Sequence, residues 1–237
     1  MLDAFSSALS GLRTSSARLQ TSANNISNLQ TPGFKASRTV ISDVQSGGSR
    51  LQGITPNQNS GSIIQTGNAF NAAINGNGFF QVSTAGGGTA FTRAGNFSVD
   101  SSGRLVDGTG NPVQPEISLP GGISSFNIGP DGQVAARVGG TTRTLGRISL
   151  ANFNNPAGLT PLGGNLFAQS AESGQAVLGS PGTGGLGQLV SGAIETSNVD
   201  IAEEAVDQIL ATNAFKANAN VIRAADEMTG TVLDIKA

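Results

Sequence analysis

The chain has 237 residues, which suits one large domain or two small ones, and its net charge is -2. It contains 34 glycines but no His, Cys, Trp or Tyr, so it lacks the commonest general base at neutral pH and any thiol nucleophile or ligand. The balanced charge argues against a nucleic-acid surface, and no segment reaches the roughly 20 apolar residues of a membrane span. We therefore expect no catalytic residue, no cofactor, no tightly bound metal, no nucleic-acid partner and no membrane span.

The N-terminal segment, residues 1–35, predicts a coiled-coil helix over residues 3–30. Its apolar residues return at alternating steps of three and four, which is a heptad seam interrupted by Ser16. Thr31 precedes Pro32 and is disfavoured in α geometry, so the helix should end there. The predicted seam of this helix consists of Leu2, Phe5, Leu9, Leu12, Leu19 and Ile26.

The middle of the chain changes from helical periodicity to turns and alternation. Residues 36–74 are rich in Ser, Gly, Gln and Asn, which predicts an extended linker. Residues 75–195 predict an all-β domain because apolar residues alternate between turn pairs. The stretch "INGNGFFQVS", residues 74–83, indicates a hairpin, and residues 124–153 indicate a meander with Pro-Asp-Gly and Gly-Gly turns.

The C-terminal segment, residues 196–237, predicts a second coiled-coil helix from Asp200 to Lys236. Glu203 and Glu204 lie near its start, where the helix dipole favours anions. Its predicted seam consists of Val206, Leu210, Val221, Met228, Val232 and Ile235.

The predicted fold class is therefore α+β, with a central all-β domain flanked by N- and C-terminal helices that pair as a coiled coil. A two-helix coil this rich in Ala, Ser and Asn buries little apolar area. Other copies of the chain are the expected source of further burial. The pattern predicts a subunit that completes its fold in a polymer and whose helical ends are mobile in the isolated chain.

Three asparagines, Asn24, Asn25 and Asn28, lie at the end of the first helix. One interpretation is that Asn simply ends helices, because its amide competes for the backbone. The other is that Asn24 and Asn28, four residues apart, share a face and fix register by pairing in a seam. Possible partners in the second helix are Asn213, Asn218 and Asn220. On this interpretation Asn24 and Asn28 form inter-helix amide hydrogen bonds in the assembled state.

Other candidate motifs have plainer interpretations. "GTGGLG", residues 182–187, matches a dinucleotide fingerprint but belongs to a Gly-Ser-Pro loop. Asp107 opens a sequence that resembles a calcium loop but lacks its central Gly and closing Glu, so a turn is expected. Arg93 and Arg104 are interpreted as strand-surface cations.

The stretch "SANNISNLQTPGFK", residues 22–35, resembles the signature of the flagellar axial proteins, the rod and hook subunits of the bacterial flagellum. Residues 66–82 and 91–113 resemble segments of the longer rod and hook proteins. Residues 150–167 and 192–210 are similar to the distal rod branch of that family. The motif residues in this chain are Asn24, Asn25, Asn28, Thr31, Gly33 and Phe34.

The resemblance implies a structural subunit of the flagellar basal-body rod that polymerises helically into a hollow, torque-transmitting shaft. It implies a rod in the periplasm, export without a cleavable signal peptide, and as partners the chain itself, other rod or hook proteins and the flagellar export apparatus. Residues 36–65 form a shorter segment than distal rod proteins carry, and Phe215 lacks the neighbouring arginine of the family. A hook or proximal rod subunit is therefore the alternative, and a secreted self-assembling β-protein or an enzyme is more distant.

Overall fold

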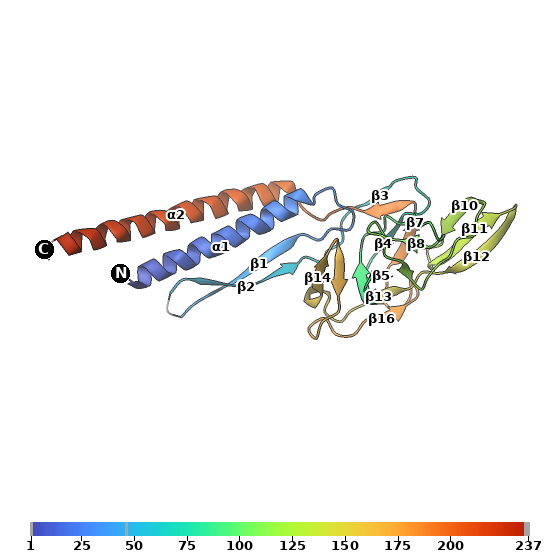
Figure 1. Ribbon diagram of the computed structural model, residues 1–237, viewed down its shortest axis with the longest axis horizontal. Helices are drawn as coiled ribbons and strands as arrows, with labels where there is room; N and C mark the ends of the chain where they lie inside the picture. Colours follow the sequence, from blue (N-terminus) through green and yellow to red (C-terminus); the bar gives the residue numbers. More distant parts are fainter. Residues whose placement is uncertain (1, 46, 235–237) are drawn as a thin grey trace. The chain divides into compact units, whose positions relative to one another are not determined.

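The computed structural model describes residues 2–45 and 47–234 and divides into two compact units. Unit 1 is made by the described parts of residues 1–29, 36–57 and 199–237, and unit 2 by residues 30–35 and 58–198. The architecture is α+β, with an N-terminal helix, a central β-rich region and a C-terminal helix (Figure 1). This order of elements confirms the predicted fold class at the level of the elements themselves.

Unit 1 contains two long helices, α1 (Leu2–Ser27) and α2 (Ile201–Asp234). The two helices run antiparallel and side by side, and the strands β1 (Ser37–Asp43) and β2 (Ser49–Pro56) lie along α1 (Figure 1). α1 ends at Ser27 rather than at residue 30, because a turn over residues 28–30 precedes the Thr-Pro-Gly break. α2 begins within one residue of its predicted start and continues through Gly230 without a break.

The predicted linker over residues 36–74 is not a linker in the structure. Its first part forms an antiparallel hairpin of β1 (Ser37–Asp43) and β2 (Ser49–Pro56) within unit 1. Its second part supplies β3 (Ile63–Gln65) and β4 (Ala72–Asn75) to unit 2. The sequence did not indicate this hairpin because its strands contain many polar residues and no strict alternation of apolar and polar residues. In the structure, the side chains of both strands are exposed or half-buried.

Unit 2 is built from short strands in several small sheets. The largest sheet has the order β14-β15-β6-β5-β13-β16, with β9 paired to β5. Its strands are β5 (Phe79–Ser83), β6 (Thr89–Thr92), β9 (Val113–Gln114), β13 (Leu150–Asn152), β14 (Thr160–Gly163), β15 (Leu166–Ala168) and β16 (Val177–Gly179). A single 3-10 turn, Pro156–Gly158, precedes β14.

The predicted meander is confirmed, whereas the predicted Asn-Gly hairpin is wrong. β10 (Ile123–Ile128), β11 (Gln133–Val138) and β12 (Thr141–Arg147) form a three-stranded antiparallel sheet. β4 and β5 flank the Asn-Gly pairs but belong to different sheets, since β4 pairs with β17 (Gln188–Ser191) and β5 with β6, β9 and β13. β7 (Ser98–Val99) and β8 (Leu105–Val106) form a small hairpin of their own.

The core of unit 2 lies on both faces of β5. Neighbouring strand residues point to opposite faces, so Phe80 joins one apolar cluster and Phe79 joins another. The rings of Phe80 and Phe97 pack edge to face with their centroids 4.9 Å apart, and the rings of Phe79 and Phe153 pack edge to face with their centroids 5.7 Å apart. Both clusters consist of buried apolar side chains, and they give unit 2 the apolar interior that the helices of unit 1 lack.

The C-terminal edge of unit 2 folds back onto its first strands. β17 (Gln188–Ser191) pairs with β4, and β18 (Ala193–Glu195) pairs with β3. This pairing brings residue 195 close to residues near 60 and, through the loop before β1, to residues 33–35.

Candidate assembly surface

The faces on which α1 and α2 meet are lined by small and polar side chains. A Cβ atom on Gly11 of α1 would lie 2.6 Å from Nδ2 of Asn218 in α2, so a larger residue there would require the Asn218 side chain to move. Ala211 and Ala225 are the buried alanines of α2. The buried side chains of α1 are Ala8, Thr14, Ser15, Thr21, Ser22 and Asn25.

The predicted apolar seam of α2 lies on a different face and is open to solvent. Its four described members, which we call the α2 apolar row, have exposed fractions between 46% and 55%. They are Val206, Leu210, Val221 and Met228. Ile209 and Phe215 are also exposed and were not part of the predicted seam. An exposed run of large apolar side chains is unusual for a monomer and marks an interaction surface.

The predicted seam of α1 is partly covered. Phe5 and Leu9 are exposed, whereas Leu12, Leu19 and Ile26 are half-buried. The side chains of Leu2 and Val232 and the whole of Ile235 lie outside the described residues. The seam prediction concerns contacts between copies of the chain, so it stays a prediction.

Asn25 is the asparagine that joins elements in unit 1. Its Nδ2 donates to the carbonyl of Ser37 at 2.9 Å, and its Oδ1 accepts from the Ser37 N–H at 2.8 Å. The same Nδ2 donates to Oε1 of Glu204 at 2.7 Å. One buried amide therefore connects α1 to β1 and to the first turn of α2, and Ser22 adds a hydrogen bond to the Glu204 carbonyl.

Asn24 and Asn28 occupy other positions. Asn24 is exposed, and Nδ2 of Asn28 donates to the Asn24 carbonyl within the same chain segment. Asn218 lies beside Gly11, in the N-terminal half of α1, whereas Asn24 and Asn28 lie at or just after the C-terminal end of that helix. The predicted inter-helix amide bonds of Asn24 and Asn28 concern the assembled state and stay a prediction.

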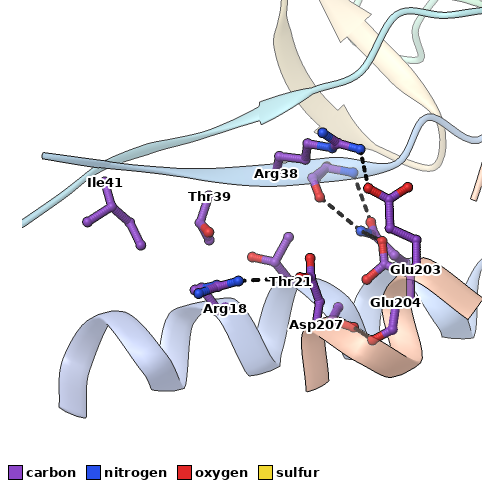
Figure 2. A pocket seen from close by; sticks show the side chains of 11 residues that line it. Arg18, Thr21, Arg38, Thr39, Ile41, Glu203, Glu204 and Asp207 are labelled. Atoms are coloured by element: carbon purple, nitrogen blue, oxygen red, sulfur yellow. Dashed lines mark hydrogen bonds and ion pairs between the residues drawn. The ribbon is translucent and has the colours of Figure 1, made fainter. Parts of the chain in front are cut away.

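A polar pocket of about 300 Å³ lies between α1, β1 and the start of α2 (Figure 2). Nη2 of Arg38 lies 2.6 Å from Oε1 of Glu203, and Nη2 of Arg18 lies 3.3 Å from Oδ1 of Asp207. All four side chains are more than a third exposed, so these ion pairs orient the three elements more than they stabilise them. Glu203 and Glu204 do lie in the first turn of α2 as expected, but Glu204 also bonds to Asn25.

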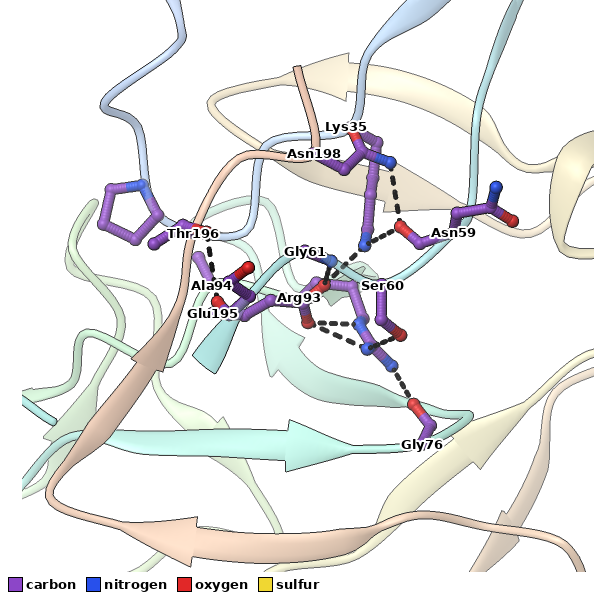
Figure 3. A network of polar contacts seen from close by, with 12 residues as sticks. Lys35, Asn59, Ser60, Gly61, Gly76, Arg93, Ala94, Glu195, Thr196 and Asn198 are labelled. Atoms are coloured by element: carbon purple, nitrogen blue, oxygen red, sulfur yellow. Dashed lines mark hydrogen bonds and ion pairs between the residues drawn. The ribbon is translucent and has the colours of Figure 1, made fainter. Parts of the chain in front are cut away.

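Unit 2 contains a buried cluster of charged residues that the sequence did not reveal (Figure 3). Nζ of Lys35 lies 2.6 Å from Oε1 of Glu195, and Nε of Arg93 donates to Oε2 of Glu195 at 2.9 Å. The side chains of Lys35 and Glu195 are 1% and 0% exposed. Arg93 is also buried, so its interpretation as a strand-surface cation is wrong; Arg104 is partly exposed and pairs with Asp100.

The remaining hydrogen bonds of this cluster go to the backbone and to Ser60. Lys35 donates to the carbonyl of Asn59, and Arg93 Nη1 donates to the carbonyls of Gly76 and Gly78. Burial lowers the pKa of Lys35 below its ordinary value, and Arg93 acts in the same direction, while the Glu195 carboxylate opposes both. The two cations face one carboxylate, which gives the cluster a formal excess of one positive charge.

The family motif ends inside this cluster. Gly33 has a φ of +68°, and a Cβ there would lie 2.5 Å from the Ala94 nitrogen, so only glycine fits. Its N–H donates to the Glu195 carbonyl at 2.8 Å, and the N–H of Phe34 donates to the Thr31 carbonyl. Gly33 is thus required by its φ and by the nearby Ala94 backbone, whereas Lys35 contacts Glu195, 160 residues further along the chain.

The two loop motifs behave as turns. Oδ1 of Asp107 accepts hydrogen bonds from the N–H groups of Thr109 and Asn111, which makes an Asx-type turn. Residues 182–187 lie in the loop between β16 and β17. Within residues 2–45 and 47–234 we find no cluster of three His, Cys, Asp or Glu side chains arranged to hold a metal ion. None of the helices described has both the length and the apolarity that crossing a membrane requires.

Three family models match the chain in order. The model of the flagella basal body rod protein matches residues 5–35, and that of the flagellar hook protein FlgE/F/G D1 domain matches residues 73–136. The model of the flagellar basal body rod FlgEFG protein C-terminal region matches residues 190–235. The first match contains the "SANNISNLQTPGFK" motif, and the third contains Glu195 and the whole of α2.

The chain is also similar to curated proteins along its whole length. It is 36% identical to the flagellar basal-body rod protein FlgG of Agrobacterium fabrum, over 95% of this chain and 96% of that protein. It is 36% identical to FlgG of Bacillus subtilis, over 100% of both chains. The flagellar hook protein FlgE of Escherichia coli is 39% identical but matches only 49% of this chain and 29% of its own length.

Proposed function

The chain belongs to the family of flagellar basal-body rod proteins, and from that premise we propose that its copies polymerise helically into a hollow, torque-transmitting shaft. As a member of this family it is a structural subunit of the rod. The helical polymer is the further step, and it follows from what unit 1 leaves uncovered.

The observation that carries the proposal is the exposure of the α2 apolar row. Burying apolar surface is favourable by about 25 cal/mol per Å², and the single chain leaves this surface in water while α1 and α2 meet through small and polar residues. In the polymer the α2 apolar row and the α1 seam pack against helices of neighbouring copies as coiled-coil contacts. Such contacts resist axial and torsional load, because sliding one helix unseats many interlocked side chains at once.

The seam of the polymer includes the residues named from the sequence in both helices. Its N-terminal part is Leu2, Phe5, Leu9, Leu12, Leu19 and Ile26, and its C-terminal part is Val206, Leu210, Val221, Met228, Val232 and Ile235. Asn24 and Asn28 lie beside this seam, and their amides form register-fixing hydrogen bonds there.

The rod interpretation is favoured over the hook interpretation by coverage. Rod relatives align with the chain from end to end, whereas the hook protein aligns with about half of it. The hook shares the architecture of the rod but must bend, so the form of the assembled tube distinguishes the two. A straight tube supports a rod subunit, and a supercoiled tube supports a hook subunit.

The proposed location is the periplasmic part of the basal body. The subunit reaches it through the flagellar export apparatus as an unfolded chain without a cleavable signal peptide. Its partners there are copies of itself and other rod or hook proteins. The proposal includes no enzymatic activity, because the chain has no His or Cys and its polar clusters join structural elements.

The test compares Leu210→Asp with Ala205→Asp. Both variants add one carboxylate to an exposed position of α2, but only the first places it in the α2 apolar row, because Ala205 lies about 140° around the helix from Leu210. Electron microscopy of concentrated protein should show tubes for the parent chain and for Ala205→Asp, and none for Leu210→Asp. Tubes of normal length from Leu210→Asp would contradict the proposed seam, and the absence of tubes from the parent chain would contradict self-assembly.

A further inference from the structure

The carboxylate of Glu195 holds together three segments that lie far apart in the sequence. Oε1 accepts from Lys35 Nζ at 2.6 Å and from the Gly61 N–H at 2.8 Å, and Oε2 accepts from Arg93 Nε at 2.9 Å (Figure 3). Lys35 and Arg93 precede Glu195 by 160 and 102 positions. Both cations are therefore buried at sites whose counter-ion is supplied by a residue near the end of unit 2.

A shortened or partly delivered chain would face a large penalty at this point. Without Glu195, Lys35 would keep the Asn59 carbonyl as its hydrogen-bond acceptor, and Arg93 would keep the Gly76 and Gly78 carbonyls and Ser60. Neutral acceptors satisfy the donors but not the charges, and two buried like charges without a counter-ion repel each other. The closed form of unit 2 is then strongly disfavoured.

The same C-terminal segment also supplies backbone closure. Residues 188–198, which we call the latch segment, contain β17 and β18, and these pair with β4 and β3. The carbonyl of Glu195 accepts from the Gly33 N–H, and the Thr196 N–H donates to the Ser62 carbonyl. The charge cluster and the strand pairing thus depend on one piece of chain.

We propose that Glu195 is a folding latch. Until the latch segment has docked, the unpaired charges of Lys35 and Arg93 keep unit 2 open, and the Glu195 carboxylate then allows it to close. The core clusters around β5 then close together with the latch rather than before it. α2 begins at Ile201, shortly after the latch segment. Unit 2 therefore closes only after export has delivered the chain as far as the start of α2. A subunit cannot present a finished β unit before the segment leading into α2 is present.

The first test follows refolding of the full-length parent chain. The chain is unfolded in urea, diluted, and pulsed at increasing times with deuterium and with an amine-acylating reagent. Its three lysines report different places: Lys35 is buried in the cluster, Lys216 is exposed on α2, and Lys236 lies near the C-terminus. Protection of the Lys35 amine, of the amides of β18 and of the amides of β5 and β6 should appear at one rate. Protection of β5 and β6 before Lys35 and β18 would overturn the proposal.

The second test uses substitutions in the full-length chain. Glu195→Gln keeps the shape of the side chain but removes the charge, and Glu116→Gln removes an exposed carboxylate of the same unit. Lys35 acylation in the folded state should increase on the order of a hundredfold or more in Glu195→Gln, because one partner of a buried pair has been removed. Glu116→Gln should behave as the parent chain. Unchanged Lys35 protection and an unchanged refolding rate in Glu195→Gln would overturn the latch.

A double variant separates charge from packing. Lys35→Met/Glu195→Gln removes one buried cation together with the carboxylate, so it should close unit 2 faster than Glu195→Gln does, even if the single variant fails to fold. Refolding of the double variant that is no better than that of Glu195→Gln would show that the charge of Lys35 is not what holds unit 2 open, and the latch would be wrong.

Discussion

The side-chain amide of Asn25 forms two hydrogen bonds with the backbone of Ser37, donating to its carbonyl and accepting from its N–H. In this geometry the amide acts as a peptide group would on a neighbouring strand. A third hydrogen bond reaches Glu204 on α2. Only an uncharged amide, which carries both a donor and an acceptor, fits this position, because its partners include a carbonyl, an N–H and a carboxylate.

Asn25→Asp should therefore destabilise unit 1, whereas Asn24→Asp should not. In Asn25→Asp a carboxylate faces the Ser37 carbonyl and Glu204, so both donor bonds are lost and charge repulsion is added. We expect a loss of about 3 kcal/mol, because a buried group loses its partners and gains a charge. Hydrogen exchange of the amides in β1 and in the last turns of α1 measures this loss. Equal exchange rates in the two variants would show that the Asn25 hydrogen bonds contribute little.

Gly33→Ala should destabilise unit 2 more than Gly67→Ala does. Both glycines have a φ near +70°, but a Cβ at Gly67 meets nothing within 4 Å, whereas a Cβ at Gly33 lies 2.5 Å from the Ala94 nitrogen. Gly67→Ala measures backbone strain alone, about 1 kcal/mol. Gly33→Ala adds a clash with backbone, and we expect a total of at least about 3 kcal/mol. Urea unfolding gives both values, and equal losses would exclude the clash.

The helices were predictable because their signals are local. The period of three and four, the Thr-Pro-Gly break and the acidic first turn of α2 each lie within a few residues, and α1 and α2 follow them closely. The meander was predictable for the same reason, since its turns contain Pro-Asp-Gly and Gly-Gly. The β1–β2 hairpin was not, because its residues are polar and most of them are partly exposed.

The charged cluster could not be predicted from spacing. Lys35, Arg93 and Glu195 come together only because β18 folds back on β3, and no local pattern encodes that pairing. Asn25 shows a different failure. Sequence reasoning chose Asn24 and Asn28 because residues four apart share a helix face, but it could not know that the face beside them contacts a strand.

The stability of unit 2 should rise with pH in the alkaline range through Lys35. Its pKa in the folded chain is below the ordinary value of 10.5, chiefly because of burial. Between the folded pKa and 10.5 the unfolded chain binds more protons than the folded chain, so the free energy of unfolding increases with pH. The chain has no Tyr or Cys, which leaves this range free of their titrations.

The measurement is urea unfolding followed by circular dichroism from about pH 8 to about pH 11. The difference in unfolding free energy between the parent chain and Lys35→Met should change in favour of the parent chain as the pH rises. Lys216→Met, which removes an exposed lysine, is the control and should show no such trend. A parent-minus-Lys35→Met difference that stays constant with pH would contradict the lowered pKa.

Asp100 should make unit 2 sensitive to acid. The backbone N–H of Arg104 is the main cause that lowers the pKa of Asp100 below 3.8, and the Arg104 guanidinium and the Ser102 N–H act in the same direction. A lowered carboxyl pKa contributes stability that is present above pH 3.8 and is lost as the pH falls through the folded pKa. The stability advantage of the parent chain over Asp100→Asn should therefore shrink below that pH. Acid titrations of the two chains that run parallel would contradict this assignment.

The isolated chain should have a resistant unit 2 and protease-sensitive helices. α1 and α2 meet through small and polar groups and leave the α2 apolar row in water, so little burial offsets a backbone entropy cost of roughly 1 to 2 kcal/mol per residue. Limited proteolysis of the monomer, read by mass spectrometry, should cut the helical ends, before about residue 29 and after about residue 200, before it cuts unit 2, by the same entropy argument.

Substitutions in the predicted seam of α1 should separate assembly from the folding of unit 2. Leu12→Asp and Leu19→Asp each place a carboxylate in the predicted seam of α1, where burial against another copy would require the loss of its hydration. Polymerisation should be lost, while the thermal unfolding of unit 2, whose apolar clusters contain neither residue, should be unchanged. If Leu12→Asp lowers the melting temperature of unit 2, or if the ends of the parent monomer resist protease as well as its middle does, the helices fold as part of a self-contained core and do not depend on neighbouring copies.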